Sequence, residues 1–467
     1  MRYHYALAPI LLSVVFGLGT HAAERPNILF ILADDLGWGD LGCYGHPILR
    51  TPHLDQLASQ GTLFTDFYVN GSVCSPSRAA FMTGLFPARL RIHGHLADHR
   101  RNQARGMPDW VDPDTTFLPR LLKKAGYATA HIGKWHLGHG PGAPEPTAYG
   151  FDYARCFLAN GLGFEQAATD PYFWAHSTGL FVDEVIRFIE RHPNQPFYVN
   201  LWTVVPHATL HPTPEQLRPY AFLRPGRGLP YLAARQVYYS TVTAMDRELG
   251  RLFAWLRRRG IDRNTLILFS SDNGPEDIHI RNAGHSGVGS PGPFRGRKRS
   301  LYEGGIRMPF IVRWPTRVPA GKVNRTSVVS GVDFLPTLAA AAGVPLPKDY
   351  QGDGENMLDV LLGSDRARRR PLFWEWRFRI YGYHFHRSPM LAMRDGEWKL
   401  LMNPDRSRVE LYHLPSDPGE VDNRAAEEPE RLEQMAAQLL RWQQTLPPGP
   451  VEAAAGKNDY PWPGANR

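Results

Sequence analysis

Short apolar runs alternate along this chain with segments whose apolar residues recur at helical spacing. The runs comprise residues 28–33, 128–132, 197–201 and 265–269. Helical spacing is clear in Leu249, Leu252, Phe253 and Leu256. Buried parallel strands read as continuous apolar runs, and helices that cover a sheet carry one apolar stripe. The alternation therefore predicts an α/β fold with a large mixed, mostly parallel sheet sandwiched by helices.

The C-terminal part of the chain has a different texture. Residues 345–390 are rich in Pro, Gly and Arg, with clustered aromatic residues. After them, residues 393–401 predict a hairpin that turns at Asp395 and Gly396, and residues 428–444 predict a helix with one apolar side. We therefore expect a main domain at residues 24–365, a small C-terminal α+β domain at residues 366–447 and a tail at residues 448–467.

The first residues have the composition of an export signal. Arg2 supplies a positive start, residues 6–18 are apolar, and residues 20–23 offer small residues for cleavage. We therefore expect a signal peptide at residues 1–23 and a protein exported to the periplasm or the medium. The apolar run is too short to span a bilayer, and no later run reaches the roughly 18 apolar residues that a span needs.

The net charge indicates which partners the protein attracts, and the cysteine content indicates whether disulfides stabilise it. The formal net charge of +8 favours acidic partners such as sulfated polysaccharide or nucleic acid, without deciding between them. Three cysteines in 467 residues do not make a disulfide framework. For Cys43 and Cys156, two unpaired buried thiols are favoured over a disulfide.

Oxygen-bearing side chains follow two of the apolar runs. Asp34 and Asp35 come directly after the first run, and Asp272 and Asn273 follow the last. The carboxyl ends of parallel strands meet at one edge of a sheet, where open α/β sheets bind ligands. Such residues are also common in turns. Hard oxygen donors gathered at one edge nevertheless predict a site for Ca²⁺ or Mg²⁺ rather than Zn²⁺.

The segment CSPSRAAFMTG at residues 74–84 combines a nucleophile, a cation and helix signals. Cys74 and Arg78 stand four positions apart and therefore share one face of a helix. Pro76 suits the first helical turn, where its missing N–H costs nothing. We therefore expect Cys74 at the N-terminus of a helix, whose partial positive charge attracts anions.

Three further segments place Lys or His next to a predicted strand or in a glycine-flanked loop. GKWHLG contains Lys134 and His136, which face the same way if the chain is extended there. PHATLHP contains His207, just beyond the run at residues 197–201, and GRKRSLYEGG contains Lys298. A lone Lys or His is usually a surface or core residue, so a functional interpretation depends on the whole set.

The order of these motifs, from about residue 25 to about residue 315, resembles the type I, formylglycine-dependent sulfatases of the alkaline phosphatase superfamily. The signature C-x-P-S-R followed by T-G is the most specific part of the resemblance. In that family the cysteine is oxidised to formylglycine (3-oxoalanine), whose hydrated aldehyde attacks sulfur. The resemblance implies that Cys74 is this nucleophile, that a formylglycine-generating enzyme matures it, and that residues 24–365 form the catalytic domain.

The resemblance also implies a role for each of the other motif residues. The implied ligands of Ca²⁺, or of Mg²⁺, are Asp34, Asp35, Cys74, Asp272 and Asn273. Lys134 and Lys298 would bind the sulfate oxygens, and His207 would contact the sulfate and protonate the leaving alcohol. Arg78 would support the aldehyde hydrate, and His136 would take a proton from its second hydroxyl.

The chemistry of a sulfate ester agrees with this set, because attack by an anionic nucleophile needs the charge on the ester oxygens neutralised. The expected activity is hydrolysis of sulfate esters at the chain ends of sulfated carbohydrates, with residues 91–110 near the pocket mouth. Neither nucleic acid nor membrane is an expected partner. Two alternatives stay open: a phosphate mono- or diester hydrolase of the same superfamily, which would normally use Thr or Ser, and a non-catalytic sulfated-glycan binder if Cys74 is not matured.

Overall fold

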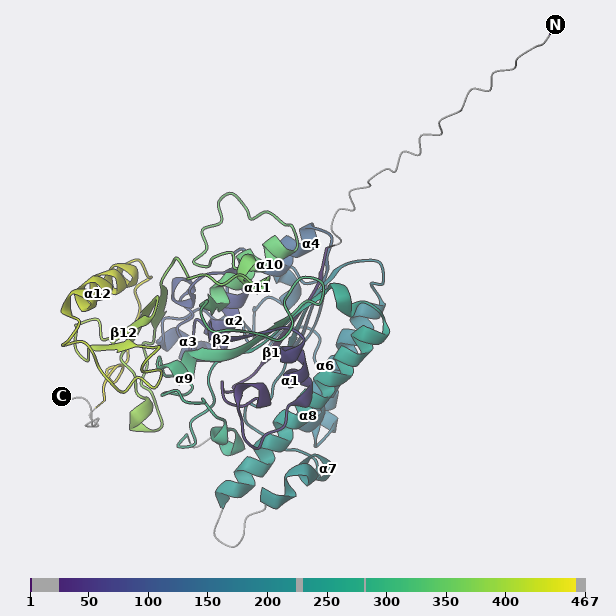
Figure 1. Cartoon of the computed structure of the whole chain (residues 1–467). Coiled ribbons are helices and arrows are strands. Elements are labelled where there is room, and N and C mark those ends of the chain that lie inside the picture. The colour runs from purple at the N-terminus through teal and green to yellow at the C-terminus, as the bar shows by residue number, and fades with distance from the viewer. Residues whose placement is uncertain (2–24, 224–229, 281–282, 459–467) are drawn as a thin grey trace.

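A nine-stranded sheet forms the centre of the molecule (Figure 1). The computed structural model describes residue 1 and residues 25–223, 230–280 and 283–458, so the expected signal peptide at residues 1–23 lies, apart from Met1, outside the described residues. The strand order is β4-β3-β5-β1-β6-β7-β2-β8, and β9 pairs with β2. The strands are β1 (Asn27–Ala33), β2 (Thr62–Tyr68), β3 (Ala128–Lys134), β4 (Tyr153–Phe157), β5 (Phe197–Trp202), β6 (Thr265–Ser271), β7 (Arg307–Arg313), β8 (Lys322–Asn324) and β9 (Val329–Ser330).

The central strands are parallel, as the apolar runs predicted. β1 pairs in parallel with β5 on one side and with β6 on the other, and β3 pairs in parallel with β4 and β5. β7 runs antiparallel to β6 and β2, so the sheet is mixed. The predicted α/β fold is therefore confirmed. The apolar pattern missed β2, because this strand contains the polar Asp66, which is buried in an ion pair with Arg307.

Helices cover both faces of this sheet (Figure 1). Leu29 and Ile31 of β1 belong to the core beneath α1, α6 and α8, whereas Ile28 and Phe30 belong to the core beneath α2, α4 and α10. This division follows from the alternation of side chains along a strand, and each fully buried side chain contributes about 1.5–3 kcal/mol. The helices are α1 (Pro52–Ser59), α2 (Cys74–Thr83), α3 (His99–Ala104), α4 (Leu118–Lys124), α5 (Gln166–Thr169), α6 (Phe173–Glu190), α7 (Pro214–Leu217), α8 (Pro230–Arg258), α9 (Glu303–Ile306), α10 (Phe334–Ala341), α11 (Leu358–Leu361) and α12 (Pro429–Gln444).

A second, four-stranded antiparallel sheet lies beside α12 (Figure 1). Its strands stand in sequence order: β10 (Leu372–Glu375), β11 (Leu391–Asp395), β12 (Trp398–Met402) and β13 (Glu410–His413). β11 and β12 form the predicted hairpin, which turns at Gly396, where φ is 57°. A small C-terminal α+β unit is therefore present as expected, and its boundaries at residues 366–447 stay a prediction.

Cysteines and apolar helices give two further findings. Cys43, Cys74 and Cys156 are all free, as expected for the first and last, although Cys43 is only half-buried. Within the part of the chain that the structure describes, no helix has the length and apolar character needed to cross a membrane.

Buried charges connect the small sheet with α9, the short helix that precedes β7 of the large sheet. On β12, the ammonium of Lys399 donates to Glu303 Oε1 at 2.8 Å and lies 2.9 Å from Glu420 Oε1. All three side chains are fully buried. Burial raises the pKa of Glu420 to about 7, although the charge of Lys399 opposes this effect. Glu303 also lies 3.2 Å from Nη1 of Arg307, so Glu420 depends on Lys399 more than Glu303 does.

Replacing Lys399 with Met should destabilise the fold by about 3–5 kcal/mol, because Glu420 loses its buried cation and Glu303 keeps only its ion pair with Arg307. The loss of folding free energy should grow as the pH rises through about 7. In this range the buried carboxyl groups of the folded variant still bind protons, whereas the same groups are ionised in the unfolded chain. Urea unfolding on both sides of that pH measures both effects. The control Lys348→Met, at an exposed lysine, should change stability by less than about 0.5 kcal/mol, and equal stabilities of the two variants would contradict this role.

Candidate active site

The polar residues that follow β1 and β6 lie side by side at the carboxyl edge of the sheet. Ala33 of β1 is opposite Ser271 of β6, and the backbone N–H of Asp35 donates to Oδ1 of Asp272 at 3.1 Å. Four side-chain atoms lie within 4.8 Å of one another, and they belong to Asp34, Asp35, Cys74 and Asp272. The strand ends therefore bring together the carboxylates that the sequence suggested.

Asn273 adds an amide oxygen to this cluster. Its Nδ2 donates to Oδ1 of Asp35 at 2.7 Å and to the carbonyl oxygen of Gly274 at 2.9 Å. Its Oδ1 is buried and has no hydrogen-bond donor among the described residues. A buried polar atom without a partner costs about 1–3 kcal/mol. A cation would satisfy this oxygen, and carboxylates together with an amide oxygen suit Ca²⁺ or Mg²⁺.

Three cationic side chains balance the three carboxylates. The pairs, with their shortest N–O distances, are Lys134–Asp34 (2.7 Å), Lys298–Asp35 (2.6 Å) and Arg78–Asp272 (2.7 Å). Burial raises the pKa of Asp34, but the charges of Lys134 and His207 outweigh burial and lower this pKa overall. Burial and the charge of Asp34 raise the pKa of Asp272 to about 6. Asp34 therefore keeps its charge in mild acid, whereas Asp272 takes up a proton.

Cys74 is the first residue of α2, and Pro76 lies in the first turn of that helix, as predicted. Its Sγ lies 3.3 Å from Nζ of Lys134 and 3.5 Å from Oδ1 of Asp34. Burial raises the pKa of the thiol to about 12 despite the charges of Lys134 and Lys298. The unmodified side chain is therefore a thiol at neutral pH and a poor nucleophile.

Arg78 connects α2 with two strand ends. Its Nε and Nη2 donate to Oδ2 of Asp272 at 3.0 and 2.7 Å, and its Nη1 donates to the carbonyl oxygen of Lys134 at 2.7 Å. The guanidinium also lies 5.1 Å from the ring centre of Trp202. A fully buried guanidinium that donates three charge-assisted or backbone hydrogen bonds holds a fixed geometry. Arg78 thereby fixes α2, and with it Cys74, relative to β3 and β6.

His136 adopts a backbone conformation that the sequence did not predict. Its φ of 58° is left-handed, so the chain is not extended beyond Lys134 as the expected side-chain alternation required. The ring Nε2 donates to the carbonyl oxygen of Leu96 at 2.9 Å, and Nδ1 is buried without a partner among the described residues. Burial and the charges of Lys134 and Arg78 hold the pKa of His136 well below its usual range. The ring is therefore neutral, and Nδ1 is its acceptor atom.

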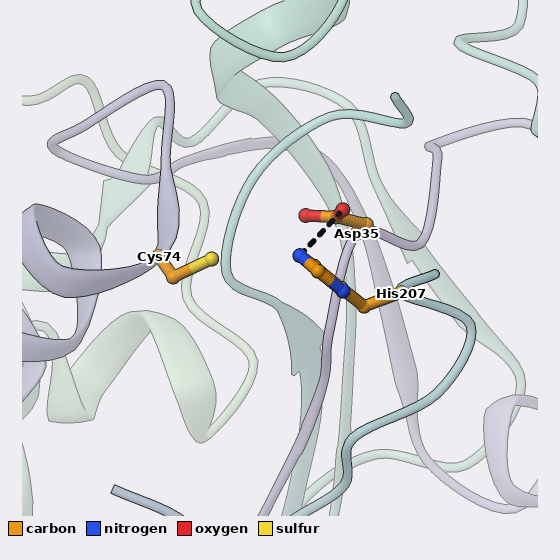
Figure 2. Close-up of side chains that lie close together, drawn as sticks. All are labelled: Asp35, Cys74 and His207. Atoms are coloured by element: carbon orange, nitrogen blue, oxygen red, sulfur yellow. Dashed lines mark ion pairs between the residues drawn. The ribbon is translucent and has the colours of Figure 1, made fainter. Parts of the chain in front are cut away.

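Asp35, Cys74 and His207 converge on one space (Figure 2). His207 Nε2 lies 3.7 Å from Oδ2 of Asp35, and its Nδ1 donates to the carbonyl oxygen of Ala208 at 2.5 Å. The His207 side chain is 36% exposed, whereas Cys74 and Asp35 are buried. Burial and the charge of Lys298 lower the pKa of His207, while the charge of Asp35 opposes them. His207 therefore lies on the solvent side of the cluster.

Comparison with known families decides the assignment. Residues 26–344 match the Sulfatase family model, and residues 294–445 match the family model described as N-sulphoglucosamine sulphohydrolase, C-terminal. The chain belongs to the sulfatase family. It is therefore a sulfuric ester hydrolase, as the Cys74 motif predicted, and its fold agrees with the alkaline phosphatase superfamily.

Named relatives are sulfatases as well. This sulfatase is 34% identical to N-acetylgalactosamine-6-sulfatase of Canis lupus familiaris over 390 residues, which cover 77% of this chain and 70% of the relative. It is 33% identical to arylsulfatase A of Homo sapiens over 416 residues, which cover 84% and 78% of the two chains. The crystal structure of Ps i-CgsB in complex with k-i-k-neocarrahexaose is similar with a TM-score of 0.75 and 28% identity, covering 90% of this chain and 93% of that one.

Sequence reasoning missed one buried carboxyl group that supports the site of this sulfatase. Asp40 accepts hydrogen bonds from the N–H groups of Gly37 and Ser290, both at 2.8 Å, and from the hydroxyl of Tyr238 at 2.7 Å. These bonds hold the loop that follows Asp35. Burial raises the pKa of Asp40 to about 7. The only signal for Asp40 was its place among the glycines after the Asp-Asp pair.

Proposed function

We propose that this sulfatase hydrolyses sulfate esters of carbohydrates, with Cys74 matured to formylglycine by a formylglycine-generating enzyme and with Ca²⁺ or Mg²⁺ as its metal. The observation that carries this proposal is the convergence of Cys74 with three carboxylates and with the ammonium groups of Lys134 and Lys298. A nucleophile among cations and metal-binding oxygens meets the needs of an anionic ester, whose reacting oxygens must be neutralised.

The oxygens of Asp34, Asp35 and Asp272, the free Oδ1 of Asn273 and position 74 would hold the metal ion. A bound divalent cation would supply charge neutralisation at the sulfate oxygens. Lys134 and Lys298 reach the same cluster from β3 and from the loop before α9, so both can bind sulfate oxygens there.

Position 74 supplies the attacking group. Formylglycine would provide a hydrated aldehyde whose hydroxyl attacks sulfur. The N-terminus of α2 favours the anion that approaches it, and Arg78 on the same helix fixes its orientation. The thiol itself is unsuited to this task because its pKa is raised to about 12 by burial. Maturation of Cys74 is therefore part of the proposal.

Two histidines divide the proton transfers. His207 would protonate the leaving alcohol from Nε2 of its cationic ring, because Nδ1 donates to Ala208 and Nε2 faces Asp35 at the entrance of the cluster. His136 would accept a proton at position 74 as sulfate is released, because its neutral ring leaves Nδ1 free of any partner within the described residues. Such positioned acid and base groups each contribute about 10²- to 10⁴-fold in rate.

The proposed substrate class is a sulfated carbohydrate, from which the enzyme removes sulfate groups at chain ends. The relatives named above include an N-acetylgalactosamine-6-sulfatase, and a similar structure contains a neocarrahexaose. The net charge of +8 supports an anionic polymer as partner. We also propose that residues 24–365 form the catalytic domain, and that the protein is exported.

The phosphate-ester alternative shares the superfamily but normally uses Thr or Ser as nucleophile. Cys74 at the N-terminus of α2 favours the sulfate ester. The non-catalytic alternative requires that Cys74 stay unmodified. Release of inorganic sulfate, without release of phosphate from the matching phosphate ester, separates the proposal from both alternatives.

A panel of position-defined sulfated mono- and oligosaccharides, compared with nitrophenyl sulfate by kcat/KM, tests the substrate class. The sugars should be turned over faster, because binding energy from parts of the substrate remote from sulfur assists the chemical step. A clear preference for the aryl ester would contradict the carbohydrate assignment and leave the sulfatase assignment intact.

Replacing His207 with Gln should lower kcat/KM for a sugar sulfate by about 10²- to 10⁴-fold, because the alkoxide leaving group needs a proton. Nitrophenyl sulfate should lose far less, since nitrophenolate leaves without protonation. His211→Gln, at an exposed histidine of the same loop, is the matched control and should leave both rates nearly unchanged. An equal loss on both esters would argue against His207 as the acid.

A further inference from the structure

The guanidinium of Arg105 is half-buried and has no acceptor. It forms no side-chain hydrogen bond and no ion pair with any described residue, and its Nη1 is fully covered without a partner. The guanidinium lies over the ring of Phe378, whose centre is 4.8 Å from the guanidinium carbon. A buried charged donor that lacks an acceptor costs free energy. Arg105 therefore has the environment of a group that binds something the protein does not supply.

Arg105 lies against the segment that lines the catalytic residues. A Cβ at Gly94 would stand 3.7 Å from its Nη1 and only 2.9 Å from Cε2 of Phe378, so the missing side chain at Gly94 lets the ring of Phe378 lie beside the guanidinium. Two residues further on, the carbonyl oxygen of Leu96 accepts from His136 at 2.9 Å, and its N–H donates to Oγ of Ser75 at 3.0 Å. Between them, the ring centre of His95 lies 6.3 Å from that of His136.

The loop that carries Arg105 is firmly held. The side chain of the buried Asn102 exchanges hydrogen bonds with both backbone groups of Ala97, at 2.8 and 2.9 Å, and donates to Asp109 at 2.9 Å. His99 contacts the other oxygen of Asp109 at 2.7 Å. Arg105 is the C-cap residue of α3, and its backbone N–H donates to carbonyl oxygens of that helix. The backbone that carries the guanidinium is therefore held in place by hydrogen bonds.

The surroundings of Arg105 carry an excess of positive charge. Burial, followed by the charges of Arg105, Lys298 and Arg299, lowers the pKa of His95 to about 3. Lys298 and Arg299 each bind a carboxylate, at 2.6 and 2.5 Å, whereas Arg105 binds none. Burial lowers the pKa of Arg105, and Glu452 opposes this effect without forming an ion pair. A second anion at this place would meet a cation that no carboxylate has neutralised.

We propose that Arg105 binds a second anionic group of the substrate, a carboxylate or another sulfate, next to the ester that reacts. The inference rests on the proposed function, since it assumes a sulfated sugar at Cys74. A guanidinium binds planar oxyanions through two parallel hydrogen bonds, which an ammonium cannot reproduce. Arg105 is thus a residue that selects polyanionic sugars over sugars with a single sulfate.

Binding of three defined sugars to the Cys74→Ala protein tests the proposal without turnover. All three carry the same reacting sulfate: the first has no other anion, the second adds a uronate carboxylate, and the third adds a neighbouring sulfate. Titration calorimetry should show tighter binding of the second or the third sugar. In the Arg105→Gln version this advantage should fall by roughly 10- to 100-fold, with the first sugar nearly unchanged. The sugar that loses affinity identifies the anion.

Two further variants make the result specific. Arg105→Lys should keep only part of the affinity advantage of the doubly anionic sugars, because lysine has the charge but cannot form the two parallel hydrogen bonds of a guanidinium. Arg100→Gln removes an exposed arginine of α3 and should not change the ratio of affinities. The proposal is overturned if Arg105→Gln weakens all three sugars equally, weakens none, or if no sugar is favoured. Failure of the proposed function is distinguishable, because unmutated protein would then release no sulfate from the first sugar.

Discussion

Replacing Cys74 with Ala is expected to abolish sulfate-ester hydrolysis, with a loss of at least about 10⁴-fold in kcat/KM. The physical reason is that, in the proposed function, position 74 would supply the oxygen that attacks sulfur, and alanine has no group that could replace it. The fold should survive, because the β-carbon remains and α2 is held by Arg78. Sulfate release, unfolding in urea and metal content measure the three expectations.

Two other cysteine variants sharpen this test. Cys156→Ala removes a buried thiol on β4 and should keep nearly full activity, so it controls for the loss of a thiol as such. Cys74→Ser should be inactive or badly impaired unless the host matures serine. Turnover by Cys74→Ala at the unmutated rate would refute the nucleophile assignment. A peptide mass spectrum over residues 72–91 should show an aldehyde at position 74, and a plain thiol in a turnover-competent sample would refute maturation.

The sequence was most informative where chemistry coincides with strand ends. Because β1 and β6 are parallel neighbours, Asp34 and Asp272 had to meet once the strands were recognised, and they do. The Cys74 motif likewise predicted a helix start with Pro76 in the first turn. The helix start at Cys74 follows from a local pattern, whereas the meeting of Asp34 and Asp272 also requires that β1 and β6 be neighbours in the sheet.

Other features depended on partners that are far away in the chain. The strand β2 was missed because Asp66 looks unsuited to a core until Arg307 and Arg394 are seen beside it. The left-handed turn at His136 has no signal in GKWHLG, and it invalidated the extended-chain argument while still leaving His136 beside Lys134. Pairing across hundreds of residues and single backbone angles are not encoded in local periodicity.

Removing the metal ion is expected to abolish activity, and Ca²⁺ or Mg²⁺ should restore it better than Zn²⁺. Without a metal ion, the carboxylates of Asp34, Asp35 and Asp272 would repel one another, and this repulsion raises their pKa values. Lys134 and Lys298 oppose this effect only while they stay bound to the carboxylates. The lysines are then unavailable for sulfate. All the proposed ligand atoms are oxygens, with no thiolate sulfur or imidazole nitrogen among them. Such a set favours Ca²⁺ and Mg²⁺ over Zn²⁺. Activity after chelation and re-addition of each ion measures this order.

Asp272→Ala should weaken metal binding by at least about 100-fold, because even groups that only support metal ligands change affinity by about 10- to 100-fold. Asp66→Ala is the control: it also removes a buried carboxylate that pairs with arginine, here Arg307 and Arg394, yet it should leave metal affinity unchanged. In the unmutated protein, affinity should fall as the pH drops below about 6, where Asp272 takes up a proton that the metal must displace. That competition costs up to about tenfold per pH unit. Calorimetric titration with Ca²⁺ at several pH values checks both effects, and equal affinities of Asp272→Ala and Asp66→Ala would remove Asp272 from the metal site.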